Sequence, residues 1–297
     1  MPAKIIIILN PFAKSRRAEK QIDRLCRMTG NTSISLTSHP GDATQKAAQA
    51  AKKGVSVVVA AGGDGTVNEV LNGLAGTSAA LGILPIGTMN VVARQLGLPL
   101  KLRDAWQVIQ TGATRAIDIG LARFQFNGVP QKRHFAQMAG IGLDAQIVRE
   151  VTWKEKQRWG PSSYLLTALK VIPRPAPPIR IGIKNGPSWN CAFALAGNGN
   201  YYGGPFPVFA KARLDDQLLD LCTFDSGGWR GLERFLRLTL LGPDRLPKGL
   251  QYRQTPAFTA TATGDVPVQL DGEFVGCLPA AFRVIPNGLR VVTPSTS

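Results

Sequence analysis

Cysteine, histidine and acidic side chains are all scarce in this sequence of 297 residues. Only four cysteines and two histidines are present, and no two cysteines form a CxxC pair. This supply is too small and too scattered for a zinc site or a disulfide-stapled scaffold. We therefore expect four reduced thiols, as in a cytoplasmic protein. The residues concerned are Cys26, Cys191, Cys222 and Cys277, together with His39 and His134.

Long apolar runs are absent as well. None approaches the roughly 20 residues that a membrane-spanning helix needs. The first run, residues 5–9, is too short for the core of a signal peptide. We expect a cytoplasmic chain that at most adsorbs peripherally to a membrane.

Acidic residues are outnumbered by basic ones. There are 19 Asp and Glu against 35 Lys and Arg, so the formal charge is +16. Such an excess favours a polyanionic partner, either a nucleic acid or an anionic membrane, and charge alone does not separate the two. The composition, 44% hydrophobic and 18% charged, is otherwise that of a globular protein.

Strand and helix patterns alternate through the first 120 residues. Continuous apolar runs predict buried strands, and apolar residues at helical spacing predict helices between them. This alternation is typical of a parallel sheet covered by helices. The predicted strands are 5–9, 55–60 and 81–84, and the predicted helices are 18–25, 41–53, 67–74, 91–96 and 104–110.

The remainder of the chain has a different pattern. From about residue 121, short apolar stretches lie between clusters of Gly, Pro, Asn and Asp, which predicts a β-rich, antiparallel second domain. Helical patterns interrupt it at 164–172 and 231–241. Near the end, apolar residues on either side of Pro286-Asn287-Gly288 predict two short strands joined by a turn.

A glycine-rich loop is the strongest local signal for chemistry. Residues 60–69, AAGGDGTVNE, take a buried strand through three glycines into a helix. Backbone N–H groups at such glycines and the positive end of the helix suit a phosphate group. An ordinary turn would also use glycine, but Asp64, Asn68 and Glu69 make this one more polar than a turn requires. It is not a Walker A loop, because the chain contains no GxxxxGK[ST].

Three later segments contain residues of the kinds found in functional sites. Asp271-Gly272 predicts a hairpin turn that presents Glu273. Asp215-Asp216 on its own predicts a solvated acidic turn. Gly140-Ile141-Gly142 mimics a dinucleotide fingerprint, but residues 156–214 contain no acid to bind a ribose, so we reject that interpretation.

The region that overlaps the start of this acid-free stretch is basic. Residues 149–184 hold eight Lys or Arg and two Glu, with aromatic residues Trp153, Trp159 and Tyr164 among them. Such a mixture suits the surface of an anionic bilayer. A solvated basic face over core aromatics is the alternative. Arginines at helical spacing could extend the same face; they are Arg230, Arg234 and Arg237.

Five blocks together resemble the diacylglycerol kinase catalytic-domain family of bacterial soluble lipid kinases. They occur in the family's order and span nearly the whole chain. The blocks are Asn10-Pro11, Thr37 with Gly41-Asp42-Ala43, GGDGTVNEVLNG at 62–73, LPIGTMN with AR at 84–94, and LDGE at 270–273.

The resemblance implies a two-domain kinase. An ATP-binding, phosphofructokinase-like α/β domain would comprise residues 1–120, with 282–297 returning to it, and a β-sandwich for the lipid would comprise 121–281. Glu273 would be the catalytic base, and Asp64 the carboxylate that holds the catalytic Mg²⁺. The implied nucleotide-binding residues are Asn10, Pro11, Thr37, Gly63, Asp64, Gly65, Thr66, Val67, Asn68, Glu69 and Thr88.

The family's structural magnesium site has a partial match. It would consist of the Asp216 carboxylate with the carbonyl oxygens of Arg213 and Leu218. Gln217 stands where the family usually has glycine. If that position requires a positive φ, glutamine adds strain and the ion is held weakly or not at all.

The expected function is therefore ATP-dependent phosphorylation of a membrane lipid such as diacylglycerol, on an anionic membrane surface. Sphingosine or ceramide kinases are near alternatives, and NAD kinase shares the GGDGT loop but not the continuation after it. A basic nucleic-acid-binding protein is the alternative from another class. No zinc-finger, KH, RNP or helix-turn-helix signature supports it, so we expect no nucleic-acid partner.

Overall fold

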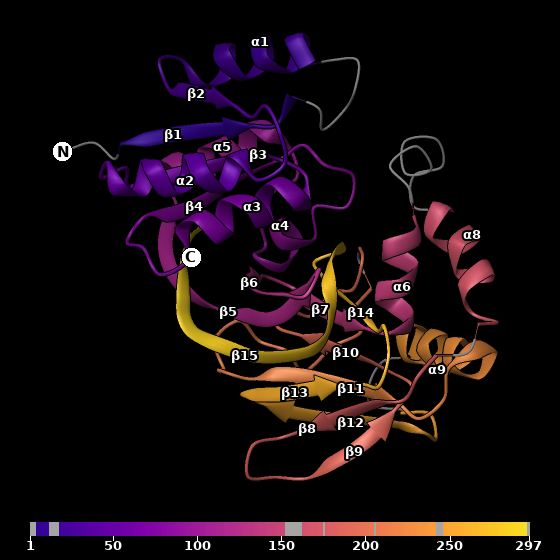
Figure 1. Ribbon diagram of the computed structural model, residues 1–297. Helices are drawn as coiled ribbons and strands as arrows, with labels where there is room; N and C mark the ends of the chain where they lie inside the picture. Colours follow the sequence, from indigo (N-terminus) through magenta and orange to yellow (C-terminus); the bar gives the residue numbers. More distant parts are fainter. Residues whose placement is uncertain are drawn as a thin grey trace. The chain divides into compact units, whose positions relative to one another are not determined.

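The computed structural model describes residues 4–11, 18–151, 162–174, 176–204, 206–241 and 246–295 (Figure 1). The chain divides into two compact units. Unit 1 consists of Met1–Ile119, Gly203–Pro205 and Pro286–Ser297, and unit 2 consists of Gly120–Tyr202 and Phe206–Ile285.

Unit 1 alternates strands and helices, as its sequence pattern predicts. The elements in chain order are β1 (Ile5–Leu9), α1 (Ala18–Thr29), β2 (Ser33–Leu36), α2 (Asp42–Lys52), β3 (Val57–Gly62), α3 (Asp64–Leu74), β4 (Ala80–Pro85), α4 (Val91–Gln95) and α5 (Leu102–Thr111).

The sheet of unit 1 is parallel and has helices on both faces. Its strand order is β4-β3-β1-β2, and every pairing is parallel. Alternate strand residues face opposite sides, so Ile7 and Val59 pack with Trp106 of α5 in one core cluster, while α2 and α3 lie together on the other side (Figure 1). β3 and β4 are buried along their whole length and β1 over its last three residues, which is why these three strands are continuous apolar runs, whereas the edge strand β2 is partly exposed.

Unit 2 is built almost entirely from antiparallel pairs. β5 (Ala113–Phe126) enters it from unit 1, and the last strand, β15 (Glu273–Thr293), returns to unit 1. The elements between them are β6 (Val129–Phe135), β7 (Met138–Ile141), α6 (Leu143–Glu150), α8 (Ser162–Val171), β8 (Ile179–Gly182), β9 (Ser188–Cys191), β10 (Phe193–Gly197), β11 (Leu219–Phe224), α9 (Gly228–Leu241), β12 (Leu250–Thr255), β13 (Ala257–Thr261) and β14 (Pro267–Leu270).

Two groups of strands in unit 2 enclose one core. The first has the order β12-β11-β10-β7-β14-β15, and the second joins β9, β8, β13, β15, β5 and β6. Phe135, Leu221 and Phe258 from both groups meet in a single buried cluster. The predicted fold class, a parallel α/β domain followed by a β-rich, sandwich-like one, is confirmed.

The prediction of two short strands around Pro286 is wrong. β15 runs without a break from Glu273 to Thr293. Asn287 has a φ of 51°, and its N–H donates to the Asp118 carboxylate at 2.8 Å. One left-handed residue disturbs a strand without reversing it, because a tight type I′ hairpin needs two in succession. The end of β15 therefore continues into unit 1, where Arg290 and Val291 pair with Ala80 and Leu81 of β4.

All four cysteines are free thiols, and Cys191 and Cys222 are buried. Within the described ranges, no helix is both long enough and apolar enough to cross a membrane. Trp153 and Trp159 of the basic region lie outside the described residues.

Candidate active site

The predicted nucleotide residues of unit 1 follow the carboxyl ends of four neighbouring parallel strands. Thr37 follows β2, Asn10 follows β1, Gly63 follows β3 and Thr88 follows β4. Carboxyl ends of parallel strands meet at one edge of the sheet, where ligands of α/β proteins bind. The structure therefore gathers segments up to about 80 residues apart at a single edge (Figure 1).

The loops after β3 and β4 are in direct backbone contact. A Cβ atom added to Gly87 would lie 2.6 Å from the Cα atom of Gly63 and 2.8 Å from Oδ1 of Asn90. The N–H groups of Ile86 and Gly87 donate to the carbonyl oxygen of Gly62 at 3.0 and 3.2 Å. Glycine is thus required where the two loops touch, and the loops form one rigid backbone surface.

Asp64, the first residue of α3, contacts the start of α4. Its Oδ1 accepts a hydrogen bond from the Val91 N–H at 2.7 Å. A carboxylate at a helix N-terminus stabilises the unpaired N–H groups there. Behind it, the Asn10 amide donates to Oγ1 of the buried Thr66 at 3.3 Å. The sequence did not reveal this structural task of Asp64.

Other predicted residues make contacts within unit 1. Oε2 of Glu69 accepts the Ala43 N–H at 3.1 Å, so this carboxylate lies at the start of α2. Val67 and Asn68 are buried, and Asn68 accepts a hydrogen bond from the Asn72 amide at 3.1 Å. Thr37 is buried too, whereas Thr88 is exposed. The structure thus places Gly63, Asp64 and Thr88 at the loops, and Val67, Asn68 and Glu69 in the packing behind them.

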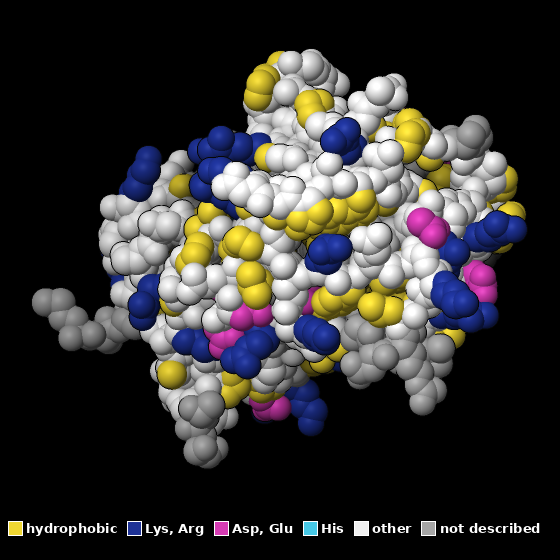
Figure 2. All heavy atoms as spheres, turned by 90° about the horizontal axis from the view of Figure 1, so that it is seen from below, with side chains coloured by type: hydrophobic (Ala, Val, Ile, Leu, Met, Phe, Trp, Pro, Cys, Tyr) yellow, Lys and Arg dark blue, Asp and Glu magenta, His cyan; other side chains and the backbone are white. Residues whose placement is uncertain are grey.

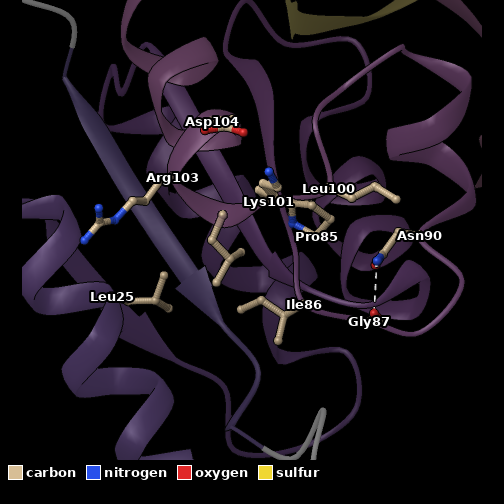
Figure 3. A pocket seen from close by; sticks show the side chains of 10 residues that line it. Leu25, Pro85, Ile86, Gly87, Asn90, Leu100, Lys101, Arg103 and Asp104 are labelled. Carbon is tan, nitrogen blue, oxygen red and sulfur yellow. Dashed lines mark hydrogen bonds between the residues drawn. The ribbon is translucent and has the colours of Figure 1, made fainter.

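A hollow of about 510 Å³ lies beside the β4–α4 loop (Figure 3). Gly87 and Asn90 line it and are joined by a 2.9 Å hydrogen bond from the Asn90 amide to the Gly87 carbonyl oxygen. Lys101, Arg103 and Asp104, from the start of α5, also line it, so two basic side chains and one acidic side chain face the hollow. Lys101 and Arg103 could not be predicted as site residues from the sequence, because no local pattern distinguishes them from other basic residues.

In unit 2, the LDGE segment forms the predicted hairpin turn. Asp271 and Gly272 have φ values of 48° and 82°, as a type I′ turn requires, and Leu270 is paired with Glu273. The carboxylate of Asp271 accepts three backbone N–H groups, at 2.7, 2.9 and 3.0 Å. They belong to Ala136, Gln137 and Met138.

A buried side-chain network supports the same turn. Gln269 accepts the Gly272 N–H at 2.8 Å and donates to Asp144 Oδ2 at 2.6 Å. The Tyr202 hydroxyl donates to the other oxygen of Asp144. Burial raises the pKa of Asp144, and these two hydrogen bonds oppose the rise. The backbone that carries Glu273 is therefore held from several directions.

Glu273 itself is partly open to solvent. Its side chain is 40% exposed, and Oε2 accepts a hydrogen bond from Nη2 of Arg133 at 2.6 Å. Arg133 comes from β6, 140 positions earlier in the chain. Sequence reasoning missed it because no short-range pattern links residues so far apart.

The candidate structural metal site offers one carboxylate. Oδ1 of Asp216 accepts the Leu218 N–H at 3.0 Å, and Gln217 has a φ of 62°. The position therefore does adopt the conformation that favours glycine. Arg213 pairs with Asp215 at 2.9 Å, which puts a positive charge close by. Among the residues that the structure describes, no three His, Cys, Asp or Glu side chains group as metal ligands.

Two family models match the chain. The diacylglycerol kinase catalytic domain matches residues 4–122, and the YegS C-terminal NAD kinase beta sandwich-like domain matches residues 137–293. The first range contains the glycine-rich loop, and the second contains the LDGE turn.

Curated proteins named diacylglycerol kinase match most of this chain. A diacylglycerol kinase of Staphylococcus saprophyticus is 31% identical over 268 residues, which are 89% of this chain and 85% of the relative. A diacylglycerol kinase of Bacillus subtilis is 30% identical over 269 residues, covering 89% and 86%.

Solved structures agree on the fold. A Bacillus anthracis protein assigned as a diacylglycerol kinase superposes with a TM-score of 0.80 at 25% identity, covering 98% of this chain and 95% of that one. Yeast NADH kinase superposes with a TM-score of 0.55 at 10% identity, covering 99% and 84%. The second is a likeness of fold alone.

Proposed function

Because this chain belongs to the diacylglycerol kinase family, we propose that it transfers the γ-phosphate of ATP to a hydroxyl group of a membrane glycerolipid such as diacylglycerol. The observation that supports this most is the coverage: both family models and relatives at about 30% identity extend over most of the chain. Unit 1 would be the nucleotide-binding domain and unit 2 the lipid-acceptor domain.

ATP would bind at the carboxyl edge of the unit 1 sheet. The absence of side chains at the Gly63–Gly87 contact would let a phosphate approach the backbone of both loops, and Lys101 and Arg103 line the hollow nearby together with one acid, Asp104. Asp64 would hold Mg²⁺, and its place at the loop fits this role, since carboxylate oxygens are preferred ligands of that ion. When bound, the ion neutralises charge on the transferred phosphate.

Glu273 would act as the general base. The lipid hydroxyl loses its proton to the carboxylate while its oxygen forms a bond to the γ-phosphorus. The bond from that phosphorus to the β–γ bridging oxygen breaks, and ADP leaves with the electron pair. The partial exposure of Glu273 and the fixed turn beneath it support this assignment.

The lipid has to be reached at a membrane surface. On unit 2, α9 exposes Trp229, Leu236 and Leu240, and α8 exposes Leu166 and Leu169. The start of α9 lies close to the end of α8. A Cβ atom added to Gly228, the first residue of α9, would lie 3.8 Å from the carbonyl oxygen of Ile172, which follows α8. We propose that this apolar surface contacts an anionic bilayer, together with Arg230 and with Arg237, whose guanidinium also pairs with Glu233 at 2.8 Å.

The surface charge also bears on the proposed membrane contact. Figure 2 shows one face of the molecule, on which Lys and Arg side chains surround a stripe of hydrophobic ones and few acidic side chains are visible. Together with the net charge of +16, this favours an anionic surface.

Phosphorylation of a lipid panel tests the proposal. Purified protein, Mg²⁺ and radiolabelled ATP are incubated with vesicles of diacylglycerol, phosphatidylglycerol, sphingosine or ceramide, and the lipids are extracted. We expect label in diacylglycerol. Label only in sphingosine or ceramide would establish the alternative lipid class. A parallel reaction contains NAD in place of vesicles, and transfer of label to NAD but to no lipid would refute lipid kinase activity. Tight binding of duplex or single-stranded DNA on filters at physiological salt would favour the nucleic-acid alternative.

A further inference from the structure

The turn fixes the backbone of Glu273 but not its carboxylate. Three backbone hydrogen bonds to Asp271 and the bond from Gly272 to Gln269 hold the chain on which Glu273 is mounted. The carboxylate lies three rotatable bonds further on, and a partly exposed glutamate loses substantial conformational freedom when it is ordered. A general base has to lie within hydrogen-bonding distance of the proton that it takes.

One contact supplies the missing restraint. Nη2 of Arg133 donates to Oε2 of Glu273 at 2.6 Å, within the range of a strong, charge-assisted hydrogen bond. No other hydrogen bond to this carboxylate is recorded from the described part of the chain. Oε2 is thus held, and Oε1 is left to accept a proton.

We propose that Arg133 is the positioning residue of Glu273, which orients the carboxylate so that Oε1 faces the acceptor hydroxyl. This inference rests on the proposed function, because it concerns the same base. In the transfer step, the hydroxyl proton moves to Oε1 and the hydroxyl oxygen bonds to phosphorus, while Arg133 keeps its own protons and its hydrogen bond to Oε2.

Stability does not explain the presence of this arginine. The pair is partly exposed, with side-chain exposures of 25% and 40%, and ion pairs of this kind contribute little to folding. The surroundings are already positive: Lys132 precedes Arg133, and the positive charges of Lys132 and Arg283, after burial, lower the pKa of His134.

Four variants test the proposal: Arg133→Gln, Arg133→Lys, Glu273→Gln and the double variant Arg133→Gln/Glu273→Gln. We expect Arg133→Gln to lower kcat by about 10- to 100-fold, as misplaced catalytic groups do. The KM values for ATP and lipid should change by less than about twofold and the Tm by less than about 3 °C. Arg133→Lys should recover part of kcat, because it keeps the charge but not the planar fork.

The double variant identifies the route of the effect. If Arg133 acts only through Glu273, Arg133→Gln in the Glu273→Gln background should lower kcat by less than about twofold. Arg123→Gln is the matched control, since it removes one positive charge from β5, opposite Lys132 of the same hairpin. It should leave kcat unchanged.

Three results would overturn the inference. They are an Arg133→Gln enzyme with kcat within about twofold of wild type, an equal loss of kcat in the Glu273→Gln background, and an equal loss in Arg123→Gln. Failure of the proposed function is distinguishable, because the wild-type enzyme would then label no lipid, or Glu273→Gln would retain full kcat.

Discussion

In the turn between β14 and β15, Asp271 accepts three backbone N–H groups, whereas Glu273 contacts a guanidinium at the surface. Changing Glu273 to Gln should therefore leave folding intact and lower turnover by about 10²- to 10⁴-fold, because glutamine cannot accept the proton. The affinity for ATP should hardly change. Steady-state kinetics with varied ATP and lipid measure both quantities.

Asp271→Asn is the companion variant. Hydrogen bonds to a charged acceptor contribute about 1.5–3 kcal/mol, and an amide cannot accept all three N–H groups. We expect a loss of about 2 kcal/mol in the free energy of unfolding, measured with urea, and a smaller loss of turnover than in Glu273→Gln. If Glu273→Gln keeps full turnover while Asp271→Asn loses it, the general base is Asp271 and not Glu273.

Asp64 makes a structural hydrogen bond and also has the proposed role of holding Mg²⁺. The substitution Asp64→Asn distinguishes the two roles, because it keeps the acceptor oxygen and removes the charge. In Asp64→Asn, the remaining Oδ1 can still accept the Val91 N–H, so the Tm should stay close to that of wild type. The lost charge should remove several kcal/mol of transition-state stabilisation and abolish measurable transfer. Activity within about tenfold of wild type would exclude Asp64 from the mechanism.

Gln217 occupies a left-handed conformation next to Asp216, with a φ of 62°. A non-glycine residue in this conformation is strained by about 1 kcal/mol. Glycine would remove the strain, but it loses more conformational entropy on folding, which offsets part of the gain. Gln217→Gly should raise the free energy of unfolding by about 0.5 kcal/mol. It should also increase any rise in Tm that Mg²⁺ causes, and Asp216→Asn should remove that rise. A destabilised Gln217→Gly protein would contradict this account.

The role of an individual residue was predictable from the sequence where it depends only on residues nearby in the chain. The Asp271-Gly272 turn follows from two residues, and the glycines of the loops were recognised through the blocks around them. Arg133, Lys101 and Arg103 were not, because their importance depends on contacts that only the folded chain creates. The second hydrogen-bonding task of Asp64, with α4, depends on such a contact as well.

Among the elements, the β10–β11–β12 sheet contains a buried acid with a clear pH signature. Asp220 lies on β11, accepts a hydrogen bond from the Tyr252 hydroxyl of β12, and is fully buried. Burial raises its pKa to about 6. The folded state therefore retains the proton between about pH 4 and 6 while the unfolded state loses it, so this group lowers stability as the pH rises through that window.

Asp220→Asn removes this dependence and keeps an acceptor for Tyr252. Relative to wild type, the variant should gain up to about 3 kcal/mol at pH 7.5 and almost nothing at pH 4. Urea unfolding at both pH values measures the difference. An equal effect of the substitution at the two pH values would mean that Asp220 does not titrate in the folded protein.

The elements that the sequence predicted well are the buried ones. β1, β3 and β4 are continuous apolar runs because helices cover both faces. The β5–β6 hairpin was missed, since β6 is largely exposed and its residues, VPQKRHF, show no apolar alternation. Gly140 lies in a segment whose sequence mimics a dinucleotide loop, but in the structure a Cβ atom there would clash with the Asp144 carboxylate, so close packing explains this glycine.

For the whole molecule, the proposed membrane contact makes a prediction about vesicles. Binding should increase with the fraction of anionic lipid and weaken with salt, at about 1 kcal/mol for each basic residue near the surface. Replacing Trp229 by Ala and Leu240 by Ser should weaken binding, because these side chains are 56% and 78% exposed on α9. Flotation assays measure the bound fraction.

Leu36→Ser is the control for that experiment, since Leu36 is an exposed leucine of unit 1. It should not alter binding. Equal binding to neutral and anionic vesicles, or insensitivity to ionic strength, would contradict the proposed contact.

At the same scale, the sequence indicated the α/β part followed by the β-rich part, because the spacing of apolar residues changes near residue 120. It did not indicate that β15 would be one uninterrupted strand. The Pro286-Asn287-Gly288 segment has the composition of a turn, and only the Asp118 contact and the pairing with β4 show that the chain continues straight on.

The pairing of β15 with β4 also bears on how the protein is made. A ribosome releases the amino end first, so β4 emerges about 200 residues before Arg290 and Val291, its neighbours in the sheet. Throughout that interval, one edge of a nearly complete parallel sheet lacks its partner, and unpaired edges are prone to association with other chains. The sheet below the glycine-rich loops is therefore complete only after the segment with Arg290 and Val291 has been synthesised, long after the loops themselves have left the ribosome.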